Sequence, residues 1–360
     1  MSSRLLQEDL FKKAGQQLFF ISENVRYGLQ RRIEQEDRKM LKVGLIGSGG
    51  MGKVHYRSYA QLQGVQVCGV CTEPDKLPDW DVPLYETVEE LCRREAPDVI
   101  DICTPTYLHP QHVASALAQD VHVICEKPLA LSVGDAKPLY ELARSKGKKL
   151  FVAQVVRYFT AYQALKWLTE EGQYGALLDL HVYRLSARPE WSVGGWLLKE
   201  EKSGGIPFDL HLHDLDFLVS LLGAPRKASC DRIRSRSDGA EQLYRFAYIF
   251  DGATGPVHVT AEAAWFAGKY PWHAGYRACF EKAVVESEGG DVRVYPQEEK
   301  PYVIAPAEIE APETGINVPP TDGYRLELED FLDCIREDRP SPVKEEEVLA
   351  VLTAIQTGLK

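Results

Sequence analysis

The stretch Lys42-Val-Gly-Leu-Ile-Gly-Ser-Gly-Gly-Met-Gly-Lys-Val-His-Tyr56 decides the fold of this chain. Its first residues have the apolar character of a buried strand, and the glycines that follow are spaced as Gly47-x-Gly49-x-x-Gly52. This spacing matches the dinucleotide-binding fingerprint, in which glycines allow a tight turn, a close approach of the backbone to a pyrophosphate and close packing of the next helix. The N-terminus of that helix favours phosphate. The residues predicted to bind a dinucleotide here are Gly47, Ser48, Gly49, Gly50, Met51 and Gly52.

Strand and helix patterns alternate from this loop to about residue 160. Apolar strand patterns cover 65–71, 97–103, 121–125 and 149–156, and helical patterns cover 54–62, 86–94, 112–119 and 132–146. Such alternation predicts a parallel sheet with helices on its faces. We therefore expect residues 40–160 to form a Rossmann domain that binds NAD or NADP.

Polar residues stand directly after two of these strands. Thr104, Pro105 and His109 follow the strand at 97–103, and Glu126 and Lys127 follow the strand at 121–125. Open α/β sheets bind their ligands at the carboxyl ends of the strands. These five residues are therefore predicted to contact the cofactor.

The choice between NAD and NADP depends on the end of the second strand. In this fold a carboxylate about 20 residues after the glycines bonds the adenosine ribose hydroxyls. Here Thr72 and Glu73 occupy that region. Glu73 favours NAD, whereas Thr72 together with Lys76 would accept the 2′-phosphate of NADP. The sequence inclines toward NAD and leaves NADP open.

From residue 161 onward the pattern changes to long alternating segments separated by Gly, Asp and Pro turns. These segments lie at 178–185, 228–236, 242–250, 257–265, 276–286 and 292–295, and helical patterns lie at 162–171, 325–336 and 344–358. A stretch at 203–218 begins as a loop and becomes a helix. The pattern predicts a second α/β domain, residues 161–360, with an antiparallel sheet.

The composition argues against several classes of function. A net charge of −11 disfavours nucleic acid and anionic membranes as partners. No apolar run approaches the ~20 residues of a membrane span, and the N-terminus does not have the pattern of a secretory signal. The eight cysteines have no disulfide or zinc spacing, so we expect free thiols in a reducing cytoplasm. Residues 1–39 are interpreted as a miscalled start or a dispensable helix, without chemistry of their own.

Four motifs agree in order and spacing: the glycine loop, Thr104-Pro105…His109, Glu126-Lys127-Pro128 and Asp209-x-x-x-His213. Together they resemble the glucose–fructose oxidoreductase / inositol dehydrogenase / MocA family, from about Met40 to the end of the chain. The resemblance implies an N-terminal Rossmann domain and a C-terminal α/β domain with a large, open, mostly antiparallel sheet. It also implies NAD(P)-linked hydride transfer on sugars, polyols or their derivatives, and homodimers or homotetramers built through that sheet.

The same resemblance implies a catalytic triad of Lys127, Asp209 and His213. Lys127 would hydrogen-bond the reacting oxygen. His213 would act as the general acid and base, because an imidazole titrates near neutral pH, and Asp209 would orient His213. Positions 209 and 213 share one face of a helix. A helix N-cap role for Asp209 and burial of His213 in the core are the alternatives.

Three further residues are candidates for the substrate site. Arg157 lies at the crossing between the two predicted domains, and Trp191 lies in a loop before the triad, where its ring would stack on a sugar. His211 occupies a position at which the family often has a small residue. A metal site made by residues 209, 211 and 213 is not expected, because position 211 points away from the other two on a regular helix.

Other aromatic and histidine side chains have weaker signals. Trp265 and Trp272 are additional pocket candidates, with ordinary core packing as the alternative. His55 and His112 lie on predicted helices and are assigned structural or cofactor-adjacent roles.

The sequence therefore predicts a cytoplasmic NAD(P)-dependent oxidoreductase that acts on CH–OH groups of a small sugar or polyol. Two alternatives stay open. One is a redox-neutral lyase or glycosidase that uses bound NAD. The other is a catalytically silent dinucleotide-binding regulator, which would have no need of Lys127, Asp209 and His213 together.

Overall fold

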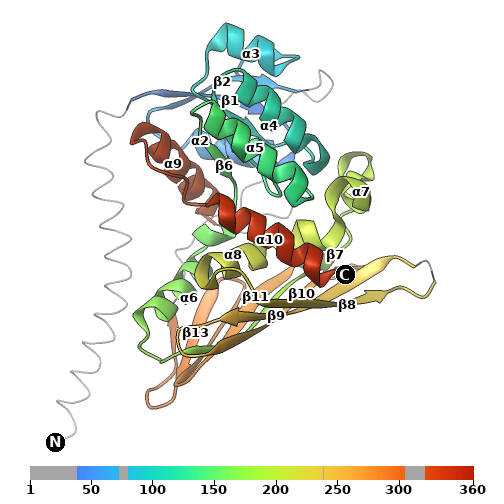
Figure 1. Cartoon of the computed structure of the whole chain (residues 1–360), viewed down its shortest axis with the longest axis vertical. Coiled ribbons are helices and arrows are strands. Elements are labelled where there is room, and N and C mark those ends of the chain that lie inside the picture. The colour runs from blue at the N-terminus through green and yellow to red at the C-terminus, as the bar shows by residue number, and fades with distance from the viewer. Residues whose placement is uncertain (1–38, 73–79, 238, 305–320) are drawn as a thin grey trace, which may run out of the picture. The chain divides into compact units, whose positions relative to one another are not determined.

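The computed structural model describes residues 39–72, 80–237, 239–304 and 321–360. The predicted N-terminal extension, apart from Lys39, lies outside these ranges, and so does Glu73. Two β-sheets, one parallel and one mostly antiparallel, organise the described residues (Figure 1). The predicted fold class is therefore confirmed.

The first sheet is parallel and has the strand order β3-β2-β1-β4-β5-β6. Its strands are β1 (Leu41–Ile46), β2 (Val65–Cys71), β3 (Leu84–Tyr85), β4 (Val99–Ile102), β5 (His122–Cys125) and β6 (Leu150–Val152). The helices that alternate with them are α2 (Gly50–Tyr59), α3 (Val88–Glu95), α4 (His109–Ala118) and α5 (Val133–Ser145). This is the doubly wound order, in which the chain reverses direction across the sheet between β1 and β4 and ligands bind beside their carboxyl ends.

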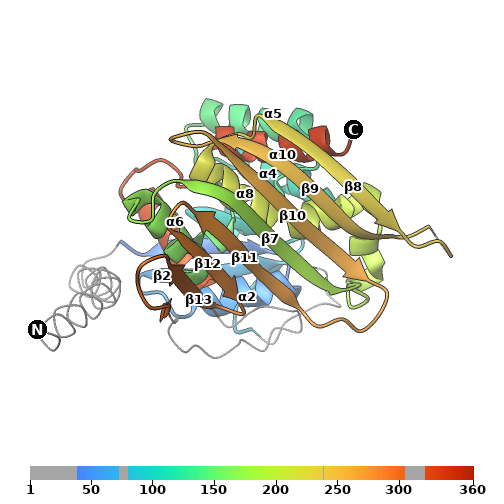
Figure 2. The ribbon, with the colours of Figure 1, turned by 90° about the horizontal axis from the view of Figure 1, so that it is seen from below.

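The second sheet has eight strands in the order β14-β13-β12-β11-β7-β10-β9-β8. They are β7 (Leu177–Ala187), β8 (Lys227–Arg234), β9 (Glu241–Asp251), β10 (Pro256–Phe266), β11 (His273–Phe280), β12 (Ala283–Glu288), β13 (Asp291–Pro296) and β14 (Tyr302–Ile304). Only the pair β7 and β10 is parallel. Figure 2 shows the sheet from the side on which no helix of the described residues lies in front of it.

One predicted strand of this sheet is wrong. The sequence pattern at 276–286 was continuous enough to predict a single segment, but the structure forms the hairpin β11–β12, which pairs Cys279 with Val284. The turn is made by the polar pair Glu281-Lys282. Two polar residues between apolar runs suffice for a hairpin turn, and this signal is easily missed inside a long alternating pattern.

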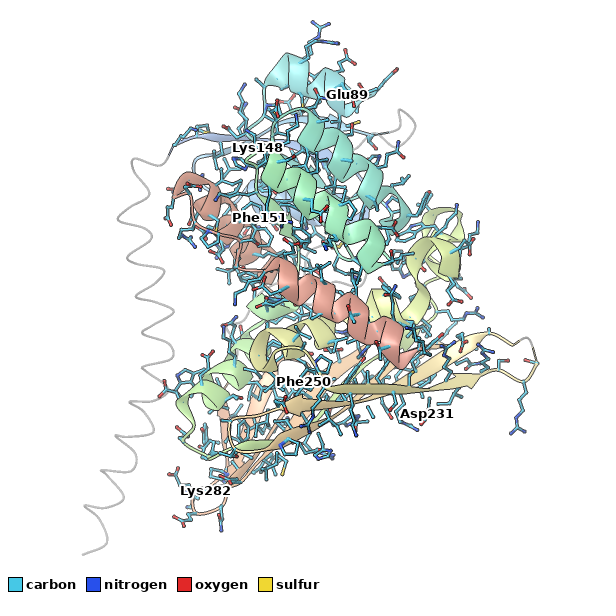
Figure 3. All side chains as sticks on the ribbon, viewed as in Figure 1. Glu89, Lys148, Phe151, Asp231, Phe250 and Lys282 are labelled. Atoms are coloured by element: carbon cyan, nitrogen blue, oxygen red, sulfur yellow. The ribbon has the colours of Figure 1, made fainter. Side chains whose placement is uncertain are left out.

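Helices cover the other face of the second sheet. They are α6 (Thr160–Glu171), α8 (Leu212–Leu222) and α10 (Glu345–Gly358). Alternate residues of β9, among them Phe246 and Phe250, are fully buried beneath them (Figure 3 labels Phe250). Burial of such aromatic side chains supplies much of the favourable free energy of folding. The remaining helices of this half of the chain pack elsewhere: α7 (Glu200–Ser203) contacts the turns Val193–Leu198 and Thr106–Leu108, and α9 (Gly323–Arg336) contacts α2 of the first domain.

The two closing helices pack against the parallel-sheet domain, and α10 also reaches the second sheet. Helix α10 packs against α8 and β8 and also against α5 of the parallel sheet. The ring of Phe331 in α9 stacks on Phe151 of β6, with 5.0 Å between ring centroids (Figure 3 labels Phe151). Both phenylalanines are fully buried. Helix α10 therefore contacts elements of both domains, and α9 packs on the parallel sheet.

A π-helix, Pro207–His211, leads directly into α8. It follows Gly204 and Gly205, which both have positive φ. The helix expected within 203–218 is present, but the expected loop before it is a single break at Gly204, between α7 and the wide π-helical turn. Such π-turns are rare and are frequent at functional sites. Within the described ranges, no helix has both the length and the apolar character needed to cross a membrane.

Candidate active site

The glycine loop fits a dinucleotide phosphate. Gly47 has φ of 94°, and a Cβ at Gly52 would lie 2.1 Å from the carbonyl oxygen of Gly47, so both positions require glycine. A Cβ at Gly49 would meet no atom within 4 Å, so the backbone there is open to an approaching group. Helix α2 begins at Gly50, has no capping side chain and has no acidic residue in its first turn. This N-terminus is therefore suited to bind an anion.

Helix α2 thus begins four residues before the predicted start of 54, because the glycine loop itself forms its first turn. The hydroxyl of Ser48 lies 2.7 Å from that of Thr72, at the end of β2. This contact joins the glycine loop to the strand end predicted to choose between NAD and NADP. The other two residues of that prediction, Glu73 and Lys76, lie outside the described residues.

The loops after β4 and β5 are held together by His109. Its buried ring lies between two carbonyl oxygens, with Nδ1 2.7 Å from that of Pro128 and Nε2 2.8 Å from that of Thr104. Pro105 comes directly before the 3₁₀ turn Thr106–Leu108, where the chain turns away from the direction of β4. The predicted direct contact of His109 with a cofactor is therefore not supported, because both ring nitrogens are occupied within the protein. Its role is to fix two loops at the carboxyl edge.

Lys127 and Asp209 form an ion pair. The Lys127 ammonium donates to the Asp209 carboxylate at 3.1 Å and to the backbone carbonyl oxygen of the same residue at 2.7 Å. Asp209 does not cap a helix, because the π-helix already begins at Pro207. The predicted orientation of His213 by Asp209 is also not observed, since the bonds of the carboxylate that the structure shows go to Lys127. The ion pair therefore connects two residues that are 82 positions apart in the sequence.

His213 is the member of the predicted triad whose ring has a nitrogen available for a ligand. Its Nδ1 is buried and has no hydrogen-bond partner among the described residues. Burial, together with the positive charges of Lys127 and Arg184, holds the pKa of His213 well below its usual range. The imidazole is therefore neutral at physiological pH and can accept a proton.

Lys127, Asp209 and His213 line one cavity. Residues from the carboxyl edge of the parallel sheet, namely Met51, Thr104 and Glu126, line it as well. Four of the six tryptophans of the chain complete its wall: Trp191, Trp196, Trp265 and Trp272. Trp191 is 52% exposed and Trp265 is buried. The cavity therefore combines a charged and hydrogen-bonding floor with broad aromatic surfaces.

The contacts of Arg157 do not support its predicted substrate role. Its guanidinium donates to both carboxylate oxygens of Asp216, at 2.6 and 2.7 Å, and to Glu347 at 2.7 Å. These bonds tie the 3₁₀ turn Val155–Tyr158 to α8 and α10. Paired and nearly buried, Arg157 does not line the cavity. It does lie at the predicted crossing between domains, but as a structural tie.

The contacts of His211 likewise do not support its predicted substrate role. Its ring is buried, stacks on Phe246 with 4.1 Å between centroids, and places Nε2 2.7 Å from the hydroxyl of Tyr248. His211 thus faces the sheet, whereas Asp209 and His213 face the cavity. These three side chains do not converge on one point.

Several cavity residues were not singled out from the sequence. Trp196 lies in the turn Val193–Leu198, only five residues after Trp191, and a survey of every aromatic residue in that loop would have found it. Ser186 and Tyr324 also line the cavity, from β7 and α9. Their positions depend on how distant segments pack, and no local sequence signal marks them.

Comparisons with known proteins agree with this geometry. The family model described as "Oxidoreductase family, NAD-binding Rossmann fold" matches residues 41–154, and the GFO/IDH/MocA C-terminal domain model matches residues 162–283. D-glucoside 3-dehydrogenase of Escherichia coli is 30% identical over 195 residues, which cover 51% of this chain and 55% of that protein. The 2,7-anhydro-N-acetylneuraminate hydratase of Mediterraneibacter gnavus is 27% identical, over 51% of this chain and 50% of its own length. The chain thus spans about half the length of these curated relatives.

A solved structure extends the likeness in fold to most of the chain. An oxidoreductase from Agrobacterium radiobacter, solved in complex with NAD+, L-tartaric acid and magnesium, superposes with a TM-score of 0.77 at 19% identity. The match covers 88% of this chain and 95% of that one. With its glycine loop, its two sheets and both family models in place, the chain belongs to the GFO/IDH/MocA oxidoreductase family, whose N-terminal part is an NAD-binding Rossmann fold.

Proposed function

We propose that this protein is an NAD(P)-dependent oxidoreductase that exchanges a hydride between a nicotinamide and a hydroxyl-bearing carbon of a sugar or polyol. One observation carries the proposal. Lys127, Asp209 and His213 line a single cavity that begins at the glycine-loop residue Met51 and is walled by tryptophans. A cavity with a few convergent polar groups and a perturbed histidine is the usual form of an enzyme active site.

In the proposed reaction the protein manages the oxygen and its proton. The Lys127 ammonium, held by Asp209, donates a hydrogen bond to the substrate oxygen and stabilises the negative charge that develops there. The neutral imidazole of His213 takes the hydroxyl proton as the C–O bond becomes a carbonyl. A nicotinamide cofactor held at the glycine loop would supply the redox chemistry, as the acceptor of the hydride with its electron pair. In the reverse direction His213 returns the proton.

The aromatic wall supports a carbohydrate substrate. A sugar or cyclic polyol presents C–H bonds on its ring faces and hydroxyls at its edge. Trp191 and Trp272 are each exposed by more than a third and line the cavity, so their rings are available to stack on such a face. The hydroxyls would then reach the polar floor around Lys127.

Between the two cofactors we propose NAD. Glu73, next to Thr72, supplies a carboxylate of the kind that bonds ribose hydroxyls and that repels the 2′-phosphate of NADP. Glu73→Gln is expected to narrow the preference for NAD over NADP in kcat/KM. A wild type that prefers NADP would contradict this choice and favour the pair Thr72 and Lys76.

The proposed function is tested by nicotinamide absorbance. NAD and NADP are supplied in parallel with a panel of hexoses, hexosides, inositols and sugar acids, and wild type is compared with Lys127→Ala and His213→Ala. Turnover with wild type that is lost in both variants is the expected result. Lys137→Ala, at an exposed position of α5 away from the cavity, serves as the matched lysine control.

A redox-neutral reaction is the second candidate function. The relative from Mediterraneibacter gnavus is named as a hydratase, so this fold accommodates reactions without net oxidation. Product formation without a net change in nicotinamide absorbance, in a protein that retains a dinucleotide through purification, would favour this candidate.

The proposed assembly is a homodimer or homotetramer of two-domain chains, divided at about residue 160. The division is supported by the parallel sheet, which ends at Val152, and the second sheet, which begins at Leu177. Along β7 buried and half-buried residues alternate, so the half-buried His181 and Tyr183 lie on the opposite face of the strand from the buried Leu180 and Val182. Light scattering is expected to give two or four times the mass of the chain, and His181→Glu is expected to lower it. A monomeric wild type would contradict the proposal.

A further inference from the structure

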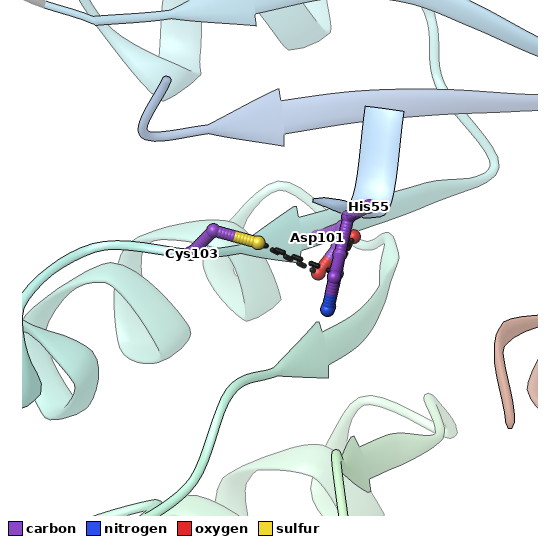
Figure 4. A group of neighbouring side chains, drawn as sticks. All are labelled: His55, Asp101 and Cys103. Atoms are coloured by element: carbon purple, nitrogen blue, oxygen red, sulfur yellow. Dashed lines mark hydrogen bonds and ion pairs between the residues drawn. The ribbon is translucent and has the colours of Figure 1, made fainter. Parts of the chain in front are cut away.

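A histidine outside the predicted triad lies at the centre of a buried polar cluster. His55 is on α2, immediately after the glycine loop, and is 0% exposed. Its Nδ1 is 2.8 Å from the Asp101 carboxylate and its Nε2 is 3.1 Å from the Glu126 carboxylate. Figure 4 shows the side chains of His55, Asp101 and Cys103 close together, with dashed lines marking the interactions between them. The cluster thus links α2 to the ends of β4 and β5.

The contacts of the ring define its protonation. A carboxylate oxygen accepts hydrogen bonds and donates none, so an imidazole between two carboxylates makes both bonds only when both its nitrogens carry a proton. Burial lowers the pKa of His55, but the charge of Asp101 and the contact with Cys103 outweigh burial and raise this pKa well above its usual range. His55 is therefore an imidazolium at neutral pH.

The other groups around the His55 ring are consistent with a single positive charge on that ring. Tyr59 donates its hydroxyl to Asp101 at 2.8 Å, and the ring of Tyr324 lies 6.4 Å from that of His55. Burial and the charge of Glu126 raise the pKa of Glu327 well above its usual range. Asp101 and Glu126 are thus the two anions that His55 balances.

Glu126 transmits this arrangement to Lys127. One carboxylate oxygen of Glu126 accepts from His55, and the other accepts from the backbone N–H of Lys127 at 3.0 Å. Although burial opposes it, hydrogen bonding from His55 and the charges of His55 and Lys127 keep the pKa of Glu126 below its usual range. The ionised Glu126 carboxylate, which accepts one hydrogen bond at each oxygen, therefore fixes the backbone of Lys127. From this backbone the Lys127 side chain reaches Asp209.

We propose that His55 is a positioning residue that holds Lys127, through Glu126, in register with the glycine loop. The inference rests on the proposed function, because it concerns the geometry of the lysine assigned there to the substrate oxygen. His55 itself does not line the cavity and acts only through its neighbour. The ring ties the helix that begins at the cofactor loop to the loop that carries Lys127, so both move as one unit.

The test compares His55→Gln with Tyr59→Phe. Glutamine places a donor toward one carboxylate only, so Glu126 loses its fixed orientation. Tyr59→Phe is the matched control, because it removes a buried hydrogen bond to the same Asp101 but leaves the bond between His55 and Glu126. A purely structural cluster would respond to both variants in the same way.

Two measurements are made on each protein. In the absence of substrate, mass spectrometry follows the rate at which acetic anhydride acetylates Lys127. We expect a several-fold faster rate in His55→Gln, because the ammonium is held less firmly by Asp209, and an unchanged rate in Tyr59→Phe. In turnover, we expect kcat to fall about 10–100-fold in His55→Gln, as for other groups that orient a reacting residue, with little change in the KM for cofactor.

The proposal is overturned if Lys127 is acetylated at the wild-type rate in His55→Gln, or if Tyr59→Phe loses as much kcat. Should His55→Gln not fold, Asp101→Asn replaces it, because an amide that accepts from Nδ1 leaves the ring neutral and Nε2 without a proton for Glu126. The acetylation measurement needs no sugar. A wild type without oxidoreductase activity but with the expected acetylation pattern would refute the proposed function and support the role of His55.

Discussion

The middle of α2 and the first turn of α8 each place a histidine close to Lys127, with opposite surroundings. His55 lies between two carboxylates, and both its nitrogens are bonded. His213 faces the positive charges of Lys127 and Arg184, and its Nδ1 has no partner among the described residues. Burial lowers the pKa of both rings, so the neighbouring charges decide the difference. One histidine is held charged within the protein, and the other is left neutral beside the cavity.

This difference separates a residue that supports the site from one that can do chemistry in it. A fully bonded imidazolium has no free nitrogen for a substrate proton, whereas a neutral ring with an open nitrogen does. The two regions therefore divide the work of the site between rigidity and proton transfer. Each prediction below alters one side of the comparison.

The largest effect is expected for Lys127→Met. This variant removes the positive charge that lowers the pKa of Glu126, beside His55, and the pKa of His213. We expect kcat/KM to fall about 10³-fold, because the donor to the substrate oxygen is lost. The unfolding temperature is expected to change little, since methionine fills a similar volume. Steady-state kinetics and thermal unfolding measure the two quantities. Retention of a tenth or more of the activity would remove Lys127 from its proposed role.

His213→Gln is expected to lower kcat by about 10²-fold or more, which is typical for loss of a general base. Glutamine retains a polar side chain of similar size but cannot take up the proton. His211→Gln is the matched control two positions away, because His211 faces the sheet and contacts Tyr248 rather than the cavity. A loss of kcat in the control as large as that in His213→Gln would show that helix packing, not proton transfer, is being measured.

The pH dependence of wild-type kcat/KM probes the neutral state of His213 directly. Because the pKa of His213 is held well below its ordinary value of 6.5, the ring stays unprotonated as the pH falls through 6.5. The acid limb of the profile is therefore expected below pH 6.5. In Lys127→Arg the positive charge is retained, so the limb is expected to stay there. A wild-type limb at or above pH 6.5 would contradict the neutral assignment.

Two glycine variants sharpen the comparison at the start of α2. Gly49→Val places its side chain in open space, so we expect unchanged unfolding but weaker dinucleotide binding, by about tenfold or more, because the side chain stands where a pyrophosphate approaches. Gly52→Ala drives a Cβ toward the Gly47 carbonyl oxygen, and overpacking of this kind costs about 1–3 kcal/mol of stability. Calorimetry of binding and denaturant unfolding distinguish the two.

The smallest effects are expected in the way the free energy of unfolding changes with pH. The raised pKa of His55 means that its contribution is complete below pH 6.5 and is lost as the pH rises through the folded-state value. The lowered pKa of His213 means that the unfolded chain binds the proton more readily, so its penalty appears as the pH falls below 6.5. Relative to His55→Gln and His213→Gln, the wild type should therefore show slopes of opposite sign, each at most about 1.4 kcal/mol per pH unit. Slopes of the same sign would contradict the comparison.

The sequence predicted those parts of the site that depend on local pattern. The glycine loop, Thr104 and Lys127 each follow a strand, and a parallel sheet brings the carboxyl ends of its strands to one edge. Asp209 and His213 came from the resemblance to a family and from their spacing on one helical face. All these predictions need only the order of strands and helices.

The site predictions that the structure does not support depend on partners far away in the sequence. Arg157 was expected at the substrate but is paired with Asp216 and Glu347, the latter 190 positions away. His211 was expected in the cavity but stacks on Phe246 of β9. A polar residue with a free hydrogen-bonding group and one that is fully paired in the core look alike in a sequence, because only packing supplies the partner.

The most direct measurement of the central claim is the transfer of an isotope. A sugar that turns over in the absorbance panel is prepared with deuterium on the carbon that is oxidised, and the nicotinamide product is analysed by mass spectrometry. We predict that the deuterium is found on the nicotinamide ring, in an amount equal to the carbonyl product formed, and that Lys127→Met and His213→Gln reduce both together. Deuterium that remains in or returns to the sugar product, with no labelled nicotinamide released, would contradict the oxidoreductase function.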